Sequence, residues 1–289
     1  MNIRGTFGDA PAGTAVVGPS GLAAAVRMPG GWTTKLLLVV GGLSLLSFAT
    51  QVVRHGLQLQ PPGLNSAERW FFVDREMGVP AWFSASLLLL AGERLWRVAT
   101  AARERGEPWV RHWKLLAVAF VYLSLDELTE IHEQVITPVR EVFDLSGALA
   151  FAWVVVAAPL VLVFGVVFLR FLVSLPTWTR WAFIISAICY VGGALGVEMI
   201  GAVLAERSGV ISTTTTVVDG VSTVTENLTI PTLTYGFVVG VEEALEMVGS
   251  VLFLGAVTVA LLQRTARGSQ AEPPERSSED GDRDGMLAA

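Results

Sequence analysis

Residues 115–134 read LLAVAFVYLSLDELTEIHEQ, and this stretch changes character half-way. The first nine residues form an apolar run of the kind that begins a membrane-spanning helix. Ionisable side chains then follow where the run would otherwise continue through lipid. Because a charge costs about 2.5–3.5 kcal/mol at the centre of a membrane helix, such residues mark functional sites by default. They are Asp126, Glu127, Glu130, His132 and Glu133.

The composition of the whole chain indicates a membrane protein. Of 289 residues, 52% are hydrophobic and 16% are charged, whereas a soluble domain carries about 25% charged residues. Cys189 is the single cysteine, which excludes an intramolecular disulfide and a thiolate metal site. The net charge of -6 and the lack of a basic motif argue against a nucleic-acid partner. No haem, nucleotide or flavin motif is present; membrane lipids are the expected partners, and the oligomeric state stays open.

Length and hydropathy predict an all-α fold, a polytopic membrane bundle of six transmembrane helices. We expect residues 1–31 to form a flexible cytoplasmic arm and residues 265–289 a disordered acidic cytoplasmic tail. The loop 208–232 has β-branched runs on both sides of Asp219-Gly220, which predicts a small extracytoplasmic β-hairpin. The predicted six-span domain covers residues 32–264, with spans at about 35–53, 79–98, 115–136, 148–170, 181–205 and 235–263.

Basic residues predict how the bundle is oriented. The connection after the second span is rich in arginine and lysine, which makes it cytoplasmic by the positive-inside rule. Alternation of the spans then places both termini in the cytoplasm and the hairpin outside. The basic residues of the other loops support the same orientation. The basic residues of this connection are Arg94, Arg97, Arg103, Arg105, Arg111 and Lys114.

Carboxylates from four separate segments fall at one depth of the predicted bundle. Counted from the cytoplasmic end of each span, Glu130, Glu198 and Glu246 stand about 24–27 Å into the membrane. Glu76, at the outer mouth of the second span, reaches a similar level. So many carboxylates together require protons, arginine partners or a metal ion. The sequence therefore predicts one acidic site in the outer half of the membrane.

We expect this site to bind a divalent metal, with further carboxylates around the ligands or accepting protons. If the third span is helical throughout, Asp126, Glu130 and Glu133 share an arc of about 60°. Oxygen ligands suit Ca²⁺, Mg²⁺ or Mn²⁺, and Fe and Zn remain open. The predicted metal ligands are Glu130, His132, Glu133, Glu198, Glu243 and Glu246, and the predicted surrounding or proton-binding residues are Glu76, Asp126, Glu127 and Glu242.

One function that fits such a site is cation-coupled transport. The motifs DELTEI (126–131) and EEALEM (242–247) both read acidic-acidic-x-x-Glu-apolar, each on the third span of a three-span half. An odd number of spans per half inverts the second half, as in many carriers built from inverted repeats. Because of this match, transport is slightly favoured over a role as an enzyme or as a structural protein. The almost wholly apolar cytoplasmic halves of the spans count against it.

The alternatives are an enzyme and a purely structural role. Carboxylates three apart on two helices, with single glutamates from others, resemble the plan of di-metal carboxylate bundles, although Glu-x-x-Glu replaces the usual Glu-x-x-His. Such an enzyme would act on a lipid or quinone. A structural or partner-binding protein would use the hairpin as its contact surface, and the carboxylates would form a polar network at the wet interface. Whether the chain is an enzyme is left open.

Three segments together resemble an uncharacterised family of bacterial multi-pass membrane proteins. They are DREMGVPAWFS (74–84), SLDELTEIHE (124–133) and VEEALEMVG (241–249). The family has the recurring segments Arg-Glu-x-x-x-Pro-x-Trp-Phe-Ser, Leu-Asp-Glu-x-x-x-Ile-His-Glu and Glu-Glu-x-x-Glu-Met. This chain has Gly78 where the family more often has Asn. The resemblance covers roughly residues 70–255 and brings no established activity. It implies a bacterial inner (plasma) membrane and a single site that unites the acidic residues of these segments with Glu198.

Overall fold

The structure is a computed structural model that describes residues 31–271, apart from 76, 144, 209–210, 219–220 and 229–231. The predicted arm, except for Gly31, and the last 18 residues of the predicted tail therefore lie outside the described residues. In the described part, four helices are long and apolar enough to cross a membrane. The chain is thus a helical membrane-embedded protein. The four helices are Trp32–Gly56, Trp153–Ser174, Thr177–Arg207 and Leu233–Ala266.

The helices form one bundle in which two long helices contain π-helical turns. The first helix, α2, runs on into a π-helical turn at Val52–Gly56, and a second π-helical turn at Gly192–Val197 joins α8 to α9. The α-helices are α2 (Trp32–Gln51), α3 (Leu64–Phe71), α4 (Val79–Glu104), α5 (Val110–Thr129), α6 (Ile136–Val142), α7 (Trp153–Ser174), α8 (Thr177–Val191), α9 (Glu198–Arg207) and α10 (Leu233–Ala271).

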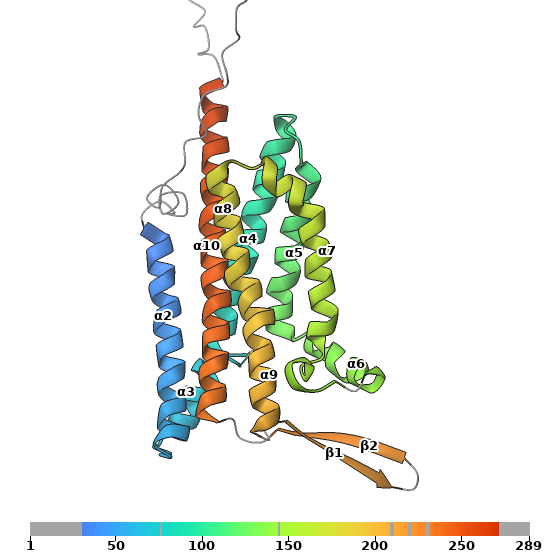
Figure 1. Cartoon of the computed structure of the whole chain (residues 1–289). Helices are drawn as coiled ribbons and strands as arrows, with labels where there is room; N and C mark the ends of the chain where they lie inside the picture. The colour runs from blue at the N-terminus through green and yellow to red at the C-terminus, as the bar shows by residue number, and fades with distance from the viewer. Residues whose placement is uncertain are drawn as a thin grey trace, which may run out of the picture.

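Helix α10 runs through the middle of the bundle (Figure 1). It packs against α2, α4, α8 and α9, while α5 packs mainly against α4. One end of the bundle carries α3, α6 and the strands, and we call it the hairpin end. The opposite end carries the α4–α5 and α7–α8 connections and the C-terminal end of α10, and we call it the tail end.

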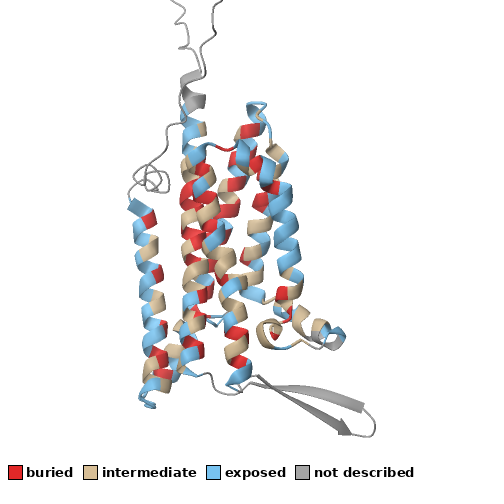
Figure 2. Ribbon diagram, in the orientation of Figure 1, coloured by how far each residue is buried: buried red, intermediate tan, exposed pale blue. Residues whose placement is uncertain are grey.

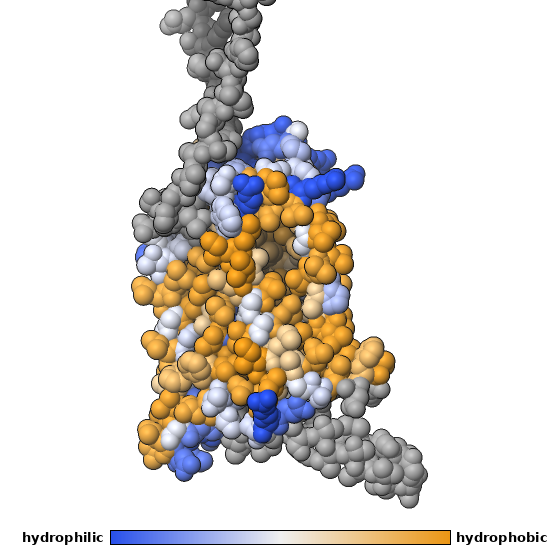
Figure 3. Space-filling view, in the orientation of Figure 1, coloured by the Kyte–Doolittle hydropathy of each residue, from blue (hydrophilic) through white to orange (hydrophobic). Residues whose placement is uncertain are grey.

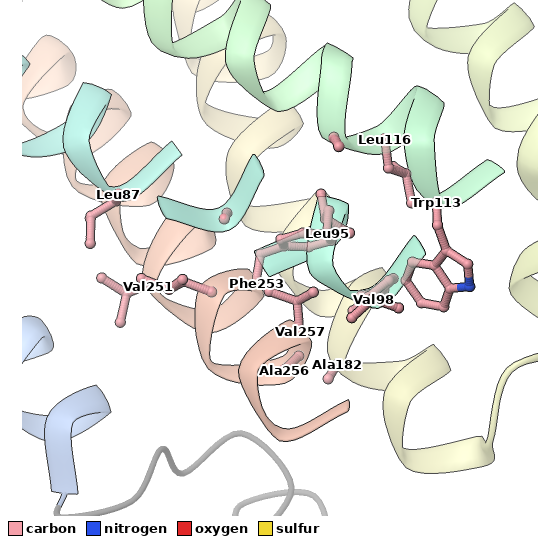
Figure 4. Close-up of a cluster of buried hydrophobic side chains, with 14 of the residues drawn as sticks. Leu87, Leu95, Val98, Trp113, Leu116, Ala182, Val251, Phe253, Ala256 and Val257 are labelled. Atoms are coloured by element: carbon pink, nitrogen blue, oxygen red, sulfur yellow. The ribbon is translucent and has the colours of Figure 1, made fainter. Parts of the chain in front are cut away.

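The main apolar core is built from residues of several helices, part of which Figure 4 shows. Leu95, Val98 and Val257 are fully buried there, and Trp113 is 2% exposed. The buried residues lie mostly on α4 and α10, whereas α7 is largely exposed (Figure 2). On the face shown in Figure 3, a broad apolar band lies between two polar ends. Such a band is the surface expected of a protein surrounded by lipid, because apolar patches this large are rare on soluble monomers.

Helices α4 and α5 occupy the places of the predicted second and third spans. They are not among the four helices that meet the length and hydropathy requirements for crossing a membrane. Six spans therefore stay a prediction.

The predicted third span differs most from the structure. Helix α5 ends at Thr129, and Glu130 has the left-handed backbone angles φ 52° and ψ 39°. The prediction of a continuous helix to residue 136, and with it the shared 60° arc, is wrong. The cause is Asp126, whose carboxylate accepts a hydrogen bond from the backbone N–H of His132 at 2.9 Å and so holds the chain in a turn. The two acidic motifs also differ in structure, since DELTEI ends a helix and EEALEM lies inside α10.

At the C-terminal side, α10 continues to Ala271. Residues 265–271 are therefore helical, and the prediction that they are disordered is wrong. They contain no proline, and the first proline after the span is Pro273, so nothing in their sequence stops a helix that has already started.

Two antiparallel strands occupy the loop where the hairpin is predicted. Strand β1 (Ile211–Val218) pairs with β2 (Val221–Leu228), and Val218 lies opposite Val221. The predicted turn at Asp219-Gly220 lies outside the described residues.

Helices α8 and α10 approach each other closely at Gly249. A Cβ atom at this position would lie 2.8 Å from the carbonyl oxygen of Ser186 and 2.8 Å from the backbone nitrogen of Tyr190. We expect Gly249→Ala to lower the free energy of unfolding in detergent by about 1–3 kcal/mol, because two backbones must separate. Gly240→Ala is the matched control on the same helix, since no described atom lies within 4 Å of its Cβ position. It should be neutral or stabilising by up to about 1 kcal/mol. An equal loss in both variants would contradict the close contact.

Candidate functional site

The structure brings carboxylates from three helices together inside the half of the bundle towards the hairpin end. They form two groups that share the acidic stretch 242–246 of α10. Glu198 and Glu242 make up the shallow group, and Glu127, Glu243 and Glu246 make up the deep group. Along α10, Glu243 stands about 15 Å and Glu246 about 20 Å from Leu233, at which the helix begins. Glu76 lies outside the described residues.

In the shallow group, Glu198 is the first residue of α9, directly after the π-helical turn. Its Oε1 accepts a hydrogen bond of 3.0 Å from the indole nitrogen of Trp153, which begins α7. Its carboxyl group also meets that of Glu242 on α10, whose side chain is 7% exposed. Two carboxyl groups in such contact repel each other unless a cation lies between them.

In the deep group, Glu127 near the end of α5 faces Glu243 and Glu246 across the bundle. Tyr190 of α8 interacts with all three. Glu246 passes directly beside Gly193 in the π-helical turn, where a Cβ would lie 3.0 Å from the Cγ of Glu246 and 2.8 Å from the carbonyl oxygen of Glu242. Glycine at position 193 is what lets this turn lie against the acidic face of α10.

Asp126 and His132 form a pair that closes the segment after α5. The imidazole Nδ1 and the carboxylate Oδ2 are 2.9 Å apart, and the His132 ring lies 4.9 Å from the ring of Trp153. Burial lowers the pKa of His132, but its hydrogen bond and charge interaction with Asp126, together with Glu133 and Glu198, raise that pKa above the usual 6.5 overall. The pair therefore favours the imidazolium form.

Glu130 and Glu133 lie beyond the end of α5, outside the spanning helices. Their carboxyl groups interact with each other, and burial followed by the charge of Glu130 raises the pKa of Glu133. Within the described residues, no three His, Cys, Asp or Glu side chains are grouped so that they could hold a metal ion. The predicted metal ligands thus lie in one region but at several depths, and the metal itself stays a prediction.

An open pocket of about 730 Å³ at the hairpin end reaches this region. Asp74 and Glu130 line it together with Gln51, Arg54 and Arg75. Asp74 is exposed to the pocket, yet its carboxyl is surrounded by protein, and this desolvation raises its pKa to about 7, helped by the charges of Glu198, Glu133 and Glu130. The pocket therefore opens beside Asp74 and Glu130, while the carboxylates of the shallow and deep groups do not line it.

Sequence reasoning missed several polar side chains of the site. Asp74 and the aromatic residues Trp153, Tyr190 and Tyr235 are among them; Tyr235 interacts with Asp74, Glu198 and Glu242. The chain has three tyrosines in all, and a buried tyrosine hydroxyl usually has a polar partner. All three tyrosines lie on predicted spans that carry glutamates, and this was the available signal.

The family described as "Domain of unknown function (DUF8692)" matches residues 36–261. The chain belongs to this family. The matched region takes in the membrane bundle and every described carboxylate of the site. No curated protein and no solved structure matches the chain.

The His132 pair gives stability a defined pH dependence. Because folding raises the pKa of His132, its contribution is fully present below about pH 6.5 and is lost as the pH rises through the raised value. A hydrogen bond to a charged group contributes about 1.5–3 kcal/mol, and partial exposure of the ring reduces this to about 1 kcal/mol. We expect the wild type to lose about that much more stability than His132→Gln between pH 6 and pH 9, measured by unfolding in detergent.

Asp126→Asn is the matching control, because it keeps an oxygen acceptor for the backbone N–H of His132 and removes the charge. The stability of Asp126→Asn should depend on pH as weakly as the stability of His132→Gln does. Parallel pH curves for the wild type and both variants would refute the assignment of this titration to the pair.

Proposed function

We propose that the protein is a six-span membrane protein that binds cations at the acidic site and couples this binding to transport. The cations are protons or one divalent metal ion that enter from the hairpin end. The observation that carries the proposal is the meeting of Glu127, Glu243 and Glu246 from α5 and α10 inside the bundle. Carboxylates in this environment repel one another and lose their hydration, so cations must neutralise them.

Arginine does not provide that neutralisation in the described part of the chain. Arg54 is engaged by Glu68 and Asn65 at the hairpin end, and Glu107 holds Arg264 at the tail end. The remaining partners for the deep carboxylates are protons or a metal ion. Tyr190 adds a phenol oxygen beside them, and an oxygen-rich site of this kind favours hard cations.

The surfaces of α4 and α5 support six spans. Leu89 and Leu90 on α4 and Val118 and Val121 on α5 are between 46% and 58% exposed, which is unfavourable in water and expected in lipid. Both helices contact the bundle over their length. With six spans, the arginine-rich α4–α5 connection places the tail end and both termini in the cytoplasm of a bacterial inner membrane.

Interruptions in the helices at the depth of the site favour transport. Helix α5 stops at Glu130, and the π-helical turn at Gly192–Val197 lies against Glu242 and Glu246. Carriers bind their ions at interrupted helices, and π-helical turns are common at functional sites. The apolar layer around Trp113 and Val257 would then be the closed gate on the tail side. The inverted-repeat argument does not add support, since its two motifs have different local structures.

A membrane enzyme remains the second candidate, and the Asp126–His132 pair is the observation that favours it. A histidine oriented by a carboxylate is a common general base and a common metal ligand. Its substrate would be a lipid or quinone that reaches His132 from the membrane at the hairpin end. A one-sided site with a closed tail half suits such an enzyme as well.

The decisive measurement is cation binding to the purified protein in detergent. We expect the wild type to take up either protons at neutral pH, seen by calorimetry in two buffers of different ionisation enthalpy, or about one equivalent of Mn²⁺, Zn²⁺ or Ca²⁺. Glu243→Gln/Glu246→Gln should weaken this binding at least about tenfold, because two buried negative charges disappear. Glu104→Gln, an exposed glutamate at the tail end, should bind like the wild type.

Transport is then tested in proteoliposomes with the same three proteins. A carrier moves the bound cation, or a pH change, across the vesicle membrane, and the double variant does not. Cation binding without any flux would reject transport and leave the enzyme. Equal binding by the wild type and the double variant would reject the acidic site itself.

A further inference from the structure

A second hollow of the bundle lies on the lipid-facing side, between α4 and α5. This groove has a volume of about 490 Å³, and apart from one ion pair it is lined by apolar side chains. It exists because two small residues let the helices come close: a Cβ at Gly92 would lie 3.2 Å from the carbonyl oxygen of Ala117. Large side chains form its walls, namely Leu89, Trp96, Val118 and Val121.

Positive charge gathers at the tail end of the groove. Glu93 pairs with both Arg94 and Arg97, and the Arg97 side chain is 64% exposed. On α5, the ammonium group of Lys114 lies 5.6 Å from the ring centre of Trp96. Two arginines that share one carboxylate and a lysine over Trp96 therefore leave a surplus of two positive charges beside an apolar groove.

We propose that this groove binds one anionic phospholipid from the leaflet at the tail end. The acyl chain lies along Leu89, Val118 and Val121, and the phosphate meets Arg97 and Lys114. Long basic side chains reach from apolar surface to the level of the headgroups, and tryptophan prefers the same level. Basic sites between membrane helices are typical places for anionic headgroups. Glu93 fixes Arg97 at the mouth of the groove.

The walls of the groove favour a lipid over a helix from a partner protein. Helices in membranes pack tightly where both surfaces carry small residues. Here the small residues, Gly92 and Ala117, are already used for the contact between α4 and α5. The rim is made of exposed large side chains, with Trp96 52% and Val118 58% exposed. A flexible acyl chain fits between such side chains, and a rigid helix is held away by them.

The site is tested by native mass spectrometry and thermal unfolding of delipidated protein in detergent. Phosphatidylglycerol and phosphatidylcholine with identical acyl chains are the two probes. We expect one tightly held phosphatidylglycerol and a higher unfolding temperature with this lipid than with phosphatidylcholine. Arg97→Gln/Lys114→Gln should weaken the binding of phosphatidylglycerol at least about tenfold. Arg69→Gln/Arg75→Gln, which removes two exposed arginines at the hairpin end, should leave it unchanged.

A second variant tests the acyl-chain position. Val118→Trp fills the groove from its open side, where the exposed residue has room, and should abolish lipid retention while the lipid-free protein keeps its unfolding temperature. Equal retention of both lipids, or unchanged retention in Val118→Trp, would overturn the proposal. A dimer that forms in the wild type and dissociates in Val118→Trp would assign the groove to a second protein copy and equally overturn it. None of these outcomes bears on the acidic site, which lies in the other half of the bundle.

Discussion

Carboxyl groups held close together inside a membrane protein set the main constraint on this structure. Glu127, Glu243 and Glu246 face one another in the bundle, and Glu198 meets Glu242 nearer the hairpin end. Like charges at such separation in a medium of low dielectric constant cannot all persist. Under the proposed function, cations neutralise these carboxyl groups and enter from the hairpin end. The pocket at Asp74 and Glu130 lies on that route.

Near the carboxyl groups, helices either end or contain a π-helical turn. This is how the chain meets the constraint. Asp126 uses its own carboxylate to hold His132, so that α5 ends in the middle of the predicted span. Helix α7 begins at Trp153, which binds Glu198 from the other side. The described residues between α5 and α7 therefore form turns and the short helices Glu133–Val135, Ile136–Val142 and Gly147–Leu149. The same aspartate shapes the backbone and fixes the protonation of His132, so its removal would disturb both.

The sequence predicted the membrane class and the approximate positions of the four long apolar helices, because apolar length is a local property of each segment. The membership of the acidic site stays a prediction. The break at Glu130 was not predictable in the same way. A glutamate in a left-handed conformation is unfavourable by itself, and it is stabilised here by hydrogen bonds between residues six apart. Tyr190 and Trp153 were missed for a related reason: their importance depends on which helices become neighbours, and no single segment contains that information.

The glycines of α8–α9 and α10 explain why the acidic face of α10 can be buried at all. At Gly193 and at Gly249 a side chain would collide with the backbone of the facing helix, so the two helices are in backbone contact above and below Glu246. Such contact holds the carboxylates at a fixed separation that larger residues would widen. The intervening π-helical turn adds one residue to the helix and shifts the face of Glu198 relative to that of Tyr190. In a uniform α-helix these two side chains, eight residues apart, would stand about 80° apart around the axis. The turn at Gly192–Val197 thus connects α8, which packs against α10, directly to the face of α10 that carries Glu242 and Glu246.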